Sequence, residues 1–258
     1  MKITSLLENT TSRTDMKTEH GLSLYIENEN NTILFDMGQT ALFTENARTL
    51  GIDLRNVDIA VLSHGHYDHG GGLSEFLKIN DRAPVFIHRD AYLPHYNGTK
   101  KYIGLDVALS NHPRVIFTDD LYEITPSVFL FSCNGKERKY PPVNSGLTEK
   151  TGDQYIADDF RHEQYLLIEE NGKRILFSGC SHKGILDIVS WFTPDILIGG
   201  FHFSKVPPGE ELCQTAKSLD AYPTEFYTCH CTGEPQYLFM REEMSRLHYL
   251  SCGETVII

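Results

Sequence analysis

Short apolar runs separated by Asn, Gly and Pro clusters recur along the first half of the chain, and this pattern predicts strands. The predicted strands cover residues 2–7, 22–27, 32–35, 57–62, 85–88, 115–117 and 128–131. Residues 39–50 carry apolar side chains at positions 42, 43, 47 and 50, which lie on one face of a helix, and Gly51 follows as a stop signal. Residues 73–79 show similar spacing. The first half is therefore predicted to mix strands with helices.

The second half has a similar order of elements. Residues 164–169 and 173–177 predict a hairpin, because Asn171-Gly172 is a dipeptide favoured in two-residue hairpin turns. Helices are predicted at 184–192, 210–219 and 235–247, and strands at 195–198, 225–229 and 255–258. The shared order of the two halves predicts an α+β fold, a four-layer αββα sandwich with two sheets face to face and helices outside. Because no linker separates the halves, we expect a single domain over residues 1–258.

Residues 134–160 depart from this pattern, because they combine two prolines, glycines and alternating charges. A connection of that length is unusual in a compact domain, so the segment is predicted to be either disordered or functional. Our hypothesis is that it forms part of a substrate lid, with a solvated loop as the alternative. This segment offers cations and an aromatic ring to a phosphorylated or heteroaromatic ligand, at Lys136, Arg138, Lys139 and Tyr140. An earlier segment adds Lys100, Lys101 and Tyr102.

Composition narrows the class of protein. Of the 258 residues, 40% are hydrophobic and 22% charged, which suffices for a core and excludes disordered and fibrous classes. The net charge of −12 disfavours nucleic acid and anionic membrane as partners, while a small anionic substrate is compatible with it. No apolar run approaches the ~20 residues that a membrane-spanning helix needs. The six cysteines are too sparse for a disulfide framework, and we expect a cytoplasmic protein with reduced thiols.

The chemistry concentrates where the predicted strand at 57–62 ends, in the segment Ser63-His64-Gly65-His66-Tyr67-Asp68-His69. Residues at i and i+2 of an extended segment point the same way, so His64 and His66 can present two imidazoles to one ion. Asp68 and His69 can face a second ion from the following turn. Glycines at 65, 70, 71 and 72 let the backbone bend tightly around these side chains. This spacing predicts a metal site, with a His-rich surface loop as the alternative.

The same segment resembles the first metal motif of the metallo-β-lactamase superfamily. Further segments resemble one branch of it, known as a dihydropterin ribofuranosylaminobenzene phosphate synthase, and they lie at residues 19–24, 34–39, 178–185, 199–202 and 230–233. The resemblance covers nearly the whole chain. It implies the αββα fold and two divalent metal ions, expected to be zinc, with iron or manganese as alternatives. Substrates vary widely within the superfamily, so the fold alone does not identify one.

The resemblance also implies roles for individual residues. His64 and His66 match the pair that holds the first metal, and Asp68 and His69 match ligands of the second. His230, which follows a predicted strand, matches the histidine that closes the second site. We therefore expect these five residues to be metal ligands.

The ligands expected between the histidine motif and His230 differ from the superfamily pattern. Most members place a histidine before the hairpin and a bridging aspartate after its second strand, where this chain has His162 and Cys180. Cys180 could bridge as a thiolate, which would favour zinc or iron, or it could be a small buried residue. His182 could supply the missing imidazole in place of His162. His202 follows a predicted buried strand, and we expect it to hydrogen-bond substrate, with a structural role as the alternative.

Other candidates are expected to act indirectly. His20 and Asp36 are predicted to orient metal ligands, a role that such sites usually require. Cys229 and Cys231 flank His230, and strand alternation should point them away from it, so we expect them to pack in the core. The histidines without a predicted role are His88, His95, His112 and His248.

These residues predict a metal-dependent hydrolase. Two divalent ions activate a shared water at neutral pH, and the water can attack a carbonyl or phosphorus centre. Asp68 would act as both ligand and catalytic residue by orienting that water. No Gly-x-Ser-x-Gly nucleophile motif occurs. The alternatives are a phosphodiesterase for cyclic nucleotide or nucleic acid, and a sensor that holds metal or ligand without turnover; the sequence does not predict an oligomeric state.

Overall fold

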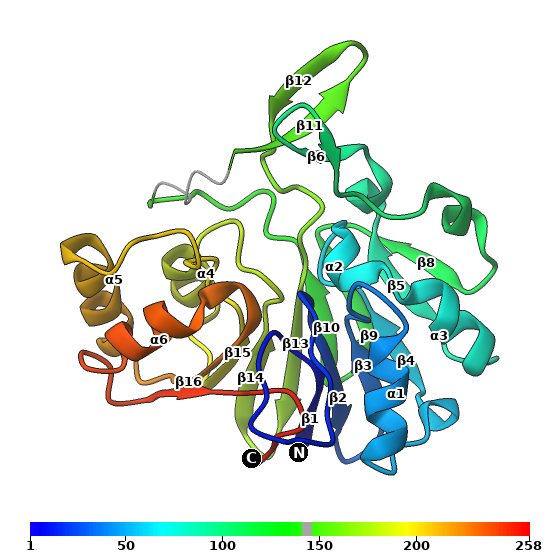
Figure 1. Ribbon diagram of the computed structural model, residues 1–258, viewed down its shortest axis with the longest axis horizontal. Helices are drawn as coiled ribbons and strands as arrows, with labels where there is room; N and C mark the ends of the chain where they lie inside the picture. The colour runs from blue at the N-terminus through cyan, green and yellow to red at the C-terminus, as the bar shows by residue number, and fades with distance from the viewer. Residues whose placement is uncertain (141–145) are drawn as a thin grey trace. The chain divides into compact units, whose positions relative to one another are not determined.

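The computed structural model describes residues 1–140 and 146–258, and the chain divides into two compact units (Figure 1). Unit 1 contains residues 1–119, 146–164 and 251–258. Unit 2 contains the described residues between 120 and 145, together with residues 165–250. The chain therefore passes from unit 1 to unit 2 and back twice. That residues 1–258 form a single domain stays a prediction.

A seven-stranded mixed sheet forms the centre of unit 1, in the order β18-β1-β2-β3-β4-β5-β8. Neighbours from β18 to β3 pair antiparallel, and neighbours from β3 to β8 pair parallel. The strands are β1 (Lys2–Leu7), β2 (Ser23–Glu27), β3 (Thr32–Phe35), β4 (Ile59–Val61), β5 (Val85–His88), β8 (Val115–Thr118) and β18 (Thr255–Ile257). Each of these strands coincides with a predicted strand. Most of them are short apolar runs with buried side chains, and the edge strands pair with such runs.

Helices pack on one face of this sheet. Phe43 and Ala47 from α1, and Phe76 from α3, share a buried core with Leu34 and Ala60 from the strands. The apolar positions that predicted the helix over 39–50 are therefore the ones that face this core. The helices of unit 1 are α1 (Leu42–Thr49), α2 (Tyr67–Gly70) and α3 (Leu73–Ile79), with short 3₁₀ turns at Leu54–Asn56, Arg89–Tyr92 and Val107–Asn111.

A second, four-stranded sheet in unit 1 takes in part of residues 134–160. This excludes disorder for residues 147–151 and 154–157, whereas the role of the segment as a substrate lid stays a prediction. The order of this sheet is β12-β11-β6-β7, and the strands are β6 (His95–Asn97), β7 (Lys101–Tyr102), β11 (Leu147–Thr151) and β12 (Gln154–Ala157). Strands β11 and β12 form a hairpin in which Gly152 takes a positive φ of 60°. The sequence pattern missed this sheet because its strands are short and largely polar. Residues 141–145, which belong to the predicted lid, lie outside the described residues.

Unit 2 contains a seven-stranded sheet in the order β17-β16-β15-β14-β13-β10-β9. Its strands are β9 (Leu121–Thr125), β10 (Val128–Phe131), β13 (Tyr165–Glu170), β14 (Lys173–Phe177), β15 (Ile196–Gly199), β16 (Glu225–Thr228) and β17 (Leu247–Tyr249). Its helices are α4 (Ile185–Phe192), α5 (Glu210–Asp220) and α6 (Glu234–Met240), with a 3₁₀ turn at His230–Thr232. All three helices contribute to one buried core with the strands. Each unit thus has a sheet layer and a helix layer, as an α+β fold requires.

Two predictions in unit 2 have different outcomes. The hairpin of β13 and β14 is confirmed, and Asn171 and Gly172 both take the positive φ values, 53° and 74°, that such a turn needs. The helix predicted over 235–247 is too long, because α6 ends at Met240 and the chain returns to the sheet as β17. Leu247 is buried in the core of unit 2, so tertiary packing overrides the helical spacing there.

Helices are short in both units. The helix α5, with 11 residues, falls well below the ~20 residues that cross a bilayer. Within residues 1–140 and 146–258, no helix has the length and apolar character needed to span a membrane.

The glycine run after the histidine motif is required by close backbone packing. A Cβ at Gly71 would overlap the carbonyl oxygen of Gln39 and would lie 2.6 Å from that of Tyr67. A Cβ at Gly72 would likewise overlap the carbonyl oxygen of Met37. Because backbone atoms cannot move aside as flexible side chains do, only glycine allows the turn after the motif to pack this closely.

We therefore expect Gly71→Ala to lower the free energy of unfolding by about 1–3 kcal/mol, the usual cost of overpacking. Gly135→Ala is the control, because no atom lies within 4 Å of a Cβ built there. Urea unfolding followed by circular dichroism measures both. Equal midpoints for the two variants would contradict the packing argument.

Candidate metal centre

The histidine motif begins where β4 ends, and it passes from extended backbone into a short helix. His66 caps α2 with an extended backbone, and Asp68 and His69 lie within the helix. The ring centroid of His64 lies 4.6 Å from that of His66 and 4.1 Å from that of His69. All four side chains are buried. The structure therefore brings together the four residues of the motif that were predicted as ligands.

Asp36 organises two of these imidazoles. Its carboxylate lies 2.6 Å from Nδ1 of His69 and accepts hydrogen bonds of 2.7 Å from the backbone N–H and the hydroxyl of Ser63. Because the Ser63 hydroxyl donates to Asp36, it accepts from Nδ1 of His64, at 2.8 Å. Both rings then carry their proton on Nδ1 and keep the Nε2 lone pair for a metal ion. This donor set fits a divalent cation, and Asp36 has the contacts expected of a residue that orients ligands.

His20 contacts the carboxylate of the motif. Its Nε2 lies 3.1 Å from Oδ2 of Asp68, and the same oxygen lies 3.9 Å from Nε2 of His69. The His20 side chain is 55% exposed, whereas that of Asp68 is 12% exposed. His20 thus meets Asp68 from the solvent side, as expected of a residue that orients this carboxylate.

A further cluster in unit 1 joins His66 to three residues outside the motif. Potential ligand atoms of His66, His95, Asp158 and His162 all lie within 4.8 Å of one another. The Asp158 carboxylate is 2.9 Å from Nδ1 of His95 and 3.3 Å from Nε2 of His162. The backbone N–H of Gly65 donates to Nδ1 of His162, at 2.9 Å. That contact keeps the proton of neutral His162 on Nε2, so the His162 ring donates to Asp158. The His162 ring also contacts the histidine motif through Gly65.

The environment of this cluster shifts two pKa values. Burial lowers the pKa of His66 well below its usual value. His66 is therefore neutral, which is the form that binds metal. Burial alone would raise the pKa of Asp158, but the hydrogen bonds from His162 and His95 outweigh burial and hold it well below its usual range. Asp158 therefore stays ionised between two imidazoles.

His95 and Asp158 are functional candidates that the sequence did not reveal. His95 was expected to be an ordinary histidine, but β6 carries it into the cluster, and Asp158 received no role. The spacing of Asp158 and His162 by four residues was the available signal. His95 gave none, because His66, Asp158 and His162 lie 29, 63 and 67 residues away along the chain.

The remaining predicted site residues belong to unit 2. Cys180, His182 and His230 are buried. The rings of His182 and His202 lie 4.3 Å apart, and potential ligand atoms of Cys180, His202 and Cys231 lie within 4.8 Å of one another. Cys231, which was expected to pack in the core, is buried but lies beside polar groups. Burial would raise the pKa of its thiol, yet hydrogen bonds with Cys180 and His202 hold it well below its usual value.

The predicted ligands are therefore divided between the units. His64, His66, Asp68 and His69 lie in unit 1, and Cys180, His182 and His230 lie in unit 2. That all seven bind metal stays a prediction. His162, the alternative to His182, lies in unit 1 and is engaged with Asp158 and Gly65.

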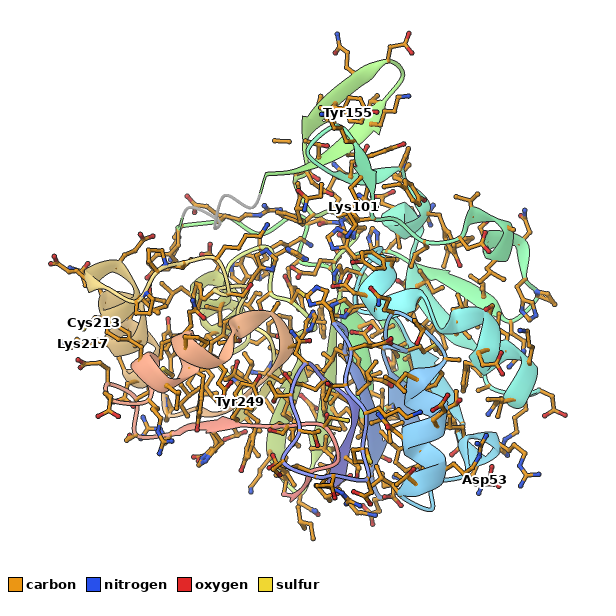
Figure 2. All side chains as sticks on the ribbon, in the orientation of Figure 1. Asp53, Lys101, Tyr155, Cys213, Lys217 and Tyr249 are labelled. Atoms are coloured by element: carbon orange, nitrogen blue, oxygen red, sulfur yellow. The ribbon has the colours of Figure 1, made fainter. Side chains whose placement is uncertain are left out.

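The cations and rings assigned to a substrate lid also fall in both units. In unit 2, the backbone N–H groups of Lys139 and Tyr140 donate to the carboxylate of Asp187, which holds this segment against α4. In unit 1, Nζ of Lys101 donates to the hydroxyl of Tyr67 at 3.1 Å and lies over its ring (Figure 2). Lys101 thus places a cation beside the histidine motif.

We expect Asp36→Asn to weaken metal binding by roughly 10–100-fold, because the amide no longer fixes the proton of His69 on Nδ1. Competition with a chromophoric chelator measures the affinity. Asp53→Asn is the control, since Asp53 lies in the same unit and pairs with Arg55 at the surface (Figure 2). Unchanged affinity in Asp36→Asn would contradict the orienting role.

Two sequence relatives match most of the length of the chain. The 7,8-dihydropterin-6-methyl-4-(beta-D-ribofuranosyl)-aminobenzene-5'-phosphate synthase of Methanocaldococcus jannaschii is 30% identical over 264 residues, which cover 89% of this chain and 88% of that protein. The uncharacterized protein MJ0448 of the same organism is 30% identical over 227 residues, covering 83% and 84%. The predicted resemblance to the synthase branch is thereby confirmed.

Solved structures and a family model agree on the fold. The crystal structure of Tm1679, described as a metal-dependent hydrolase of the beta-lactamase superfamily, matches with a TM-score of 0.85 and 28% identity, covering 100% of this chain and 99% of that one. Zinc-bound PqqB from Methylobacterium extorquens, at 11% identity, matches with a TM-score of 0.62 over 100% of both chains and shows the fold alone. The predicted α+β fold is confirmed. Because a model of the metallo-beta-lactamase superfamily matches residues 17–207, the chain belongs to that superfamily.

Proposed function

We propose that this protein is a metal-dependent hydrolase that acts on a small anionic substrate, phosphorylated or pterin-like. The observation that supports it most directly is the pair of contacts from Asp36 to His69 and from Ser63 to His64. These contacts direct Nδ1 of both buried rings away from the metal and keep the Nε2 lone pairs for it.

Under this proposal His64, His66, Asp68 and His69 hold metal, and Cys180, His182 and His230 complete the set on the strength of the sequence motifs. Two ions are proposed, with zinc first and iron or manganese as alternatives, because imidazole, carboxylate and thiolate together suit these metals. When bound, the ions would supply an activated water and polarise the oxygen of a carbonyl or phosphoryl group.

The chain's own groups position the reaction. Asp68 orients the attacking water by accepting its hydrogen bond, and His20 keeps Oδ2 of Asp68 in place by donating from Nε2. His95 and His162, which both contact the Asp158 carboxylate, pack against the His66 ring and restrict its rotation. We assign the catalytic role to Asp68 and a positioning role to His20.

The substrate class rests on charge and on a relative. The name of the M. jannaschii synthase includes a 5'-phosphate, which supports a phosphorylated substrate here. Lys101 offers a cation next to Tyr67 of the motif, and His202 is proposed to hydrogen-bond the substrate. The net charge of −12 disfavours nucleic acid or membrane as partner. A cytoplasmic location belongs to the proposal as well, since six cysteines in 258 residues are too sparse for a disulfide framework.

Metal removal and a ligand variant test the proposal. Chromogenic phosphomonoesters, phosphodiesters and thioesters are offered to the protein before and after chelation, and again after zinc is restored. We expect chelation to abolish turnover, zinc to restore it, and His66→Ala to lower kcat/KM by at least about 100-fold. His112→Ala is the control, because His112 lies in the same unit and its Nδ1 accepts from the backbone N–H of Arg114, away from the histidine motif in sequence.

The outcomes separate the alternatives. Turnover of phosphodiesters alone would favour a phosphodiesterase. Binding of metal without turnover of any ester would favour a sensor. Equal rates in His66→Ala and the parent protein would refute the assignment of the motif to catalysis.

A further inference from the structure

Three parallel strands of unit 2 end at the same edge of the sheet, and each delivers a metal-binding side chain. Strands β14, β15 and β16 pair in parallel and end at Phe177, Gly199 and Thr228. Cys180, His202 and Cys231 each follow three residues after the end of a strand. Since the carboxyl ends of parallel strands lie together, this repeated offset gathers two thiols and one imidazole in one place.

Hydrogen bonds lock the three loops to one another. The backbone N–H of Gly200 donates to the carbonyl of Gly179, at 2.7 Å. The N–H of Phe201 donates to the hydroxyl of Thr232, at 2.8 Å, and the N–H of Ser204 donates to the carbonyl of Cys231, at 3.0 Å. The loops that carry the two cysteines and the histidine are therefore held in register by their backbones.

The backbone around the cluster is specialised for it. A Cβ at Gly200 would overlap Sγ of Cys231, so the glycine makes room for the sulfur. Ser181 and His202 take positive φ values of 57° and 59°, which residues other than glycine rarely adopt. Strain of this kind persists only where surrounding contacts maintain it, and it gathers at functional sites.

Two sulfurs and one ring nitrogen then lie within 4.8 Å of one another. Nδ1 of His202 is buried and has no hydrogen-bond partner among the residues that the structure describes. A tetrahedral cation with sulfur ligands at ~2.3 Å separates its donors by about 3.3–3.8 Å, so the three donor atoms would approach one another by at most about 1.5 Å. Thiolate and imidazole together select zinc-like or softer cations over magnesium or calcium.

A pocket adjoins this cluster within unit 2. It has a volume of about 70 Å³, and its walls include His182 and His202 together with the apolar side chains of Ile185, Phe201 and Phe203. A cation held by three protein ligands keeps a fourth position open, as catalytic rather than structural zinc sites do. Of the three proposed ligands, His202 lines the pocket, so the pocket meets the site at that ring.

We infer that Cys180, His202 and Cys231 form a second kind of cation site in unit 2, a thiolate-rich site for zinc or a softer cation that opens toward this pocket. Cys231 and His202 are the new ligands, and His202 would bind the cation through Nδ1 while its Nε2–H serves the hydrogen bond to substrate proposed above. Cys180, which the sequence motif predicts as a bridging ligand, gains a second thiolate as its neighbour. The inference stands on unit 2 alone and does not require the proposed hydrolase activity.

Cadmium binding to the full, reduced and metal-free chain tests the site. We expect a cadmium NMR resonance shifted downfield to the region typical of two thiolate ligands, with sulfur-to-cadmium charge-transfer absorption in the ultraviolet. Cys231→Ser should abolish that resonance and weaken cadmium binding at the site by at least about 100-fold, more than the loss of an outer-shell partner costs. Cys213→Ser should leave both unchanged, because Cys213 lies on α5 and contacts Glu243 (Figure 2).

Two further measurements keep the test decisive. His66→Ala should retain the two-thiolate resonance while losing turnover, so the failure of one proposal does not imply failure of the other. If Cys231→Ser does not fold, the spectrum of the parent protein decides. Cadmium signals from no more than one thiolate ligand in the parent, or parent-like affinity in a folded Cys231→Ser, would overturn the inference.

Discussion

The candidate metal centre depends on one buried carboxylate. Asp36 and His69 have fully buried side chains, and a charge removed from water is tolerated only when it is paired and hydrogen-bonded. Asp36 meets this requirement with the backbone and hydroxyl of Ser63 and with the His69 ring. Because Ser63 in turn contacts His64, a single carboxylate sets the proton positions of two imidazoles. The chemistry proposed for the motif follows from that arrangement.

The same topological rule places functional groups in both units. In unit 1, Asp36 follows β3 directly, and the histidine motif begins just beyond β4, its parallel neighbour. In unit 2, Cys180, His202 and Cys231 follow three adjacent parallel strands. Strand ends expose backbone that is free to turn, so side chains from distant parts of the chain converge there. Glycines at 71 and 200 allow these turns to pack against carbonyl and sulfur atoms.

A buried polar cluster of His95, Asp158 and His162 supports the histidine motif. His66 faces His162 and His95, whose rings share the Asp158 carboxylate. The hydrogen bonds to Asp158 hold the rings of His95 and His162 beside His66. Asp158 comes from the segment just after the β11–β12 hairpin, and His95 from β6 in the same small sheet. That sheet therefore helps to support the metal motif.

Local sequence was sufficient for the large elements and for the motif, because apolar periodicity and the spacing of His64, His66, Asp68 and His69 act over a few residues. It also identified Asp36 and His20 as residues near the ligands. It did not reveal the β6–β11 pairing, the strand β17, or the roles of His95, Asp158 and Cys231. The strand β17 depends on pairing with β16, 21 residues earlier, and the other features arise where residues 50 or more positions apart meet. Tertiary packing alone decides which distant strand end adjoins which.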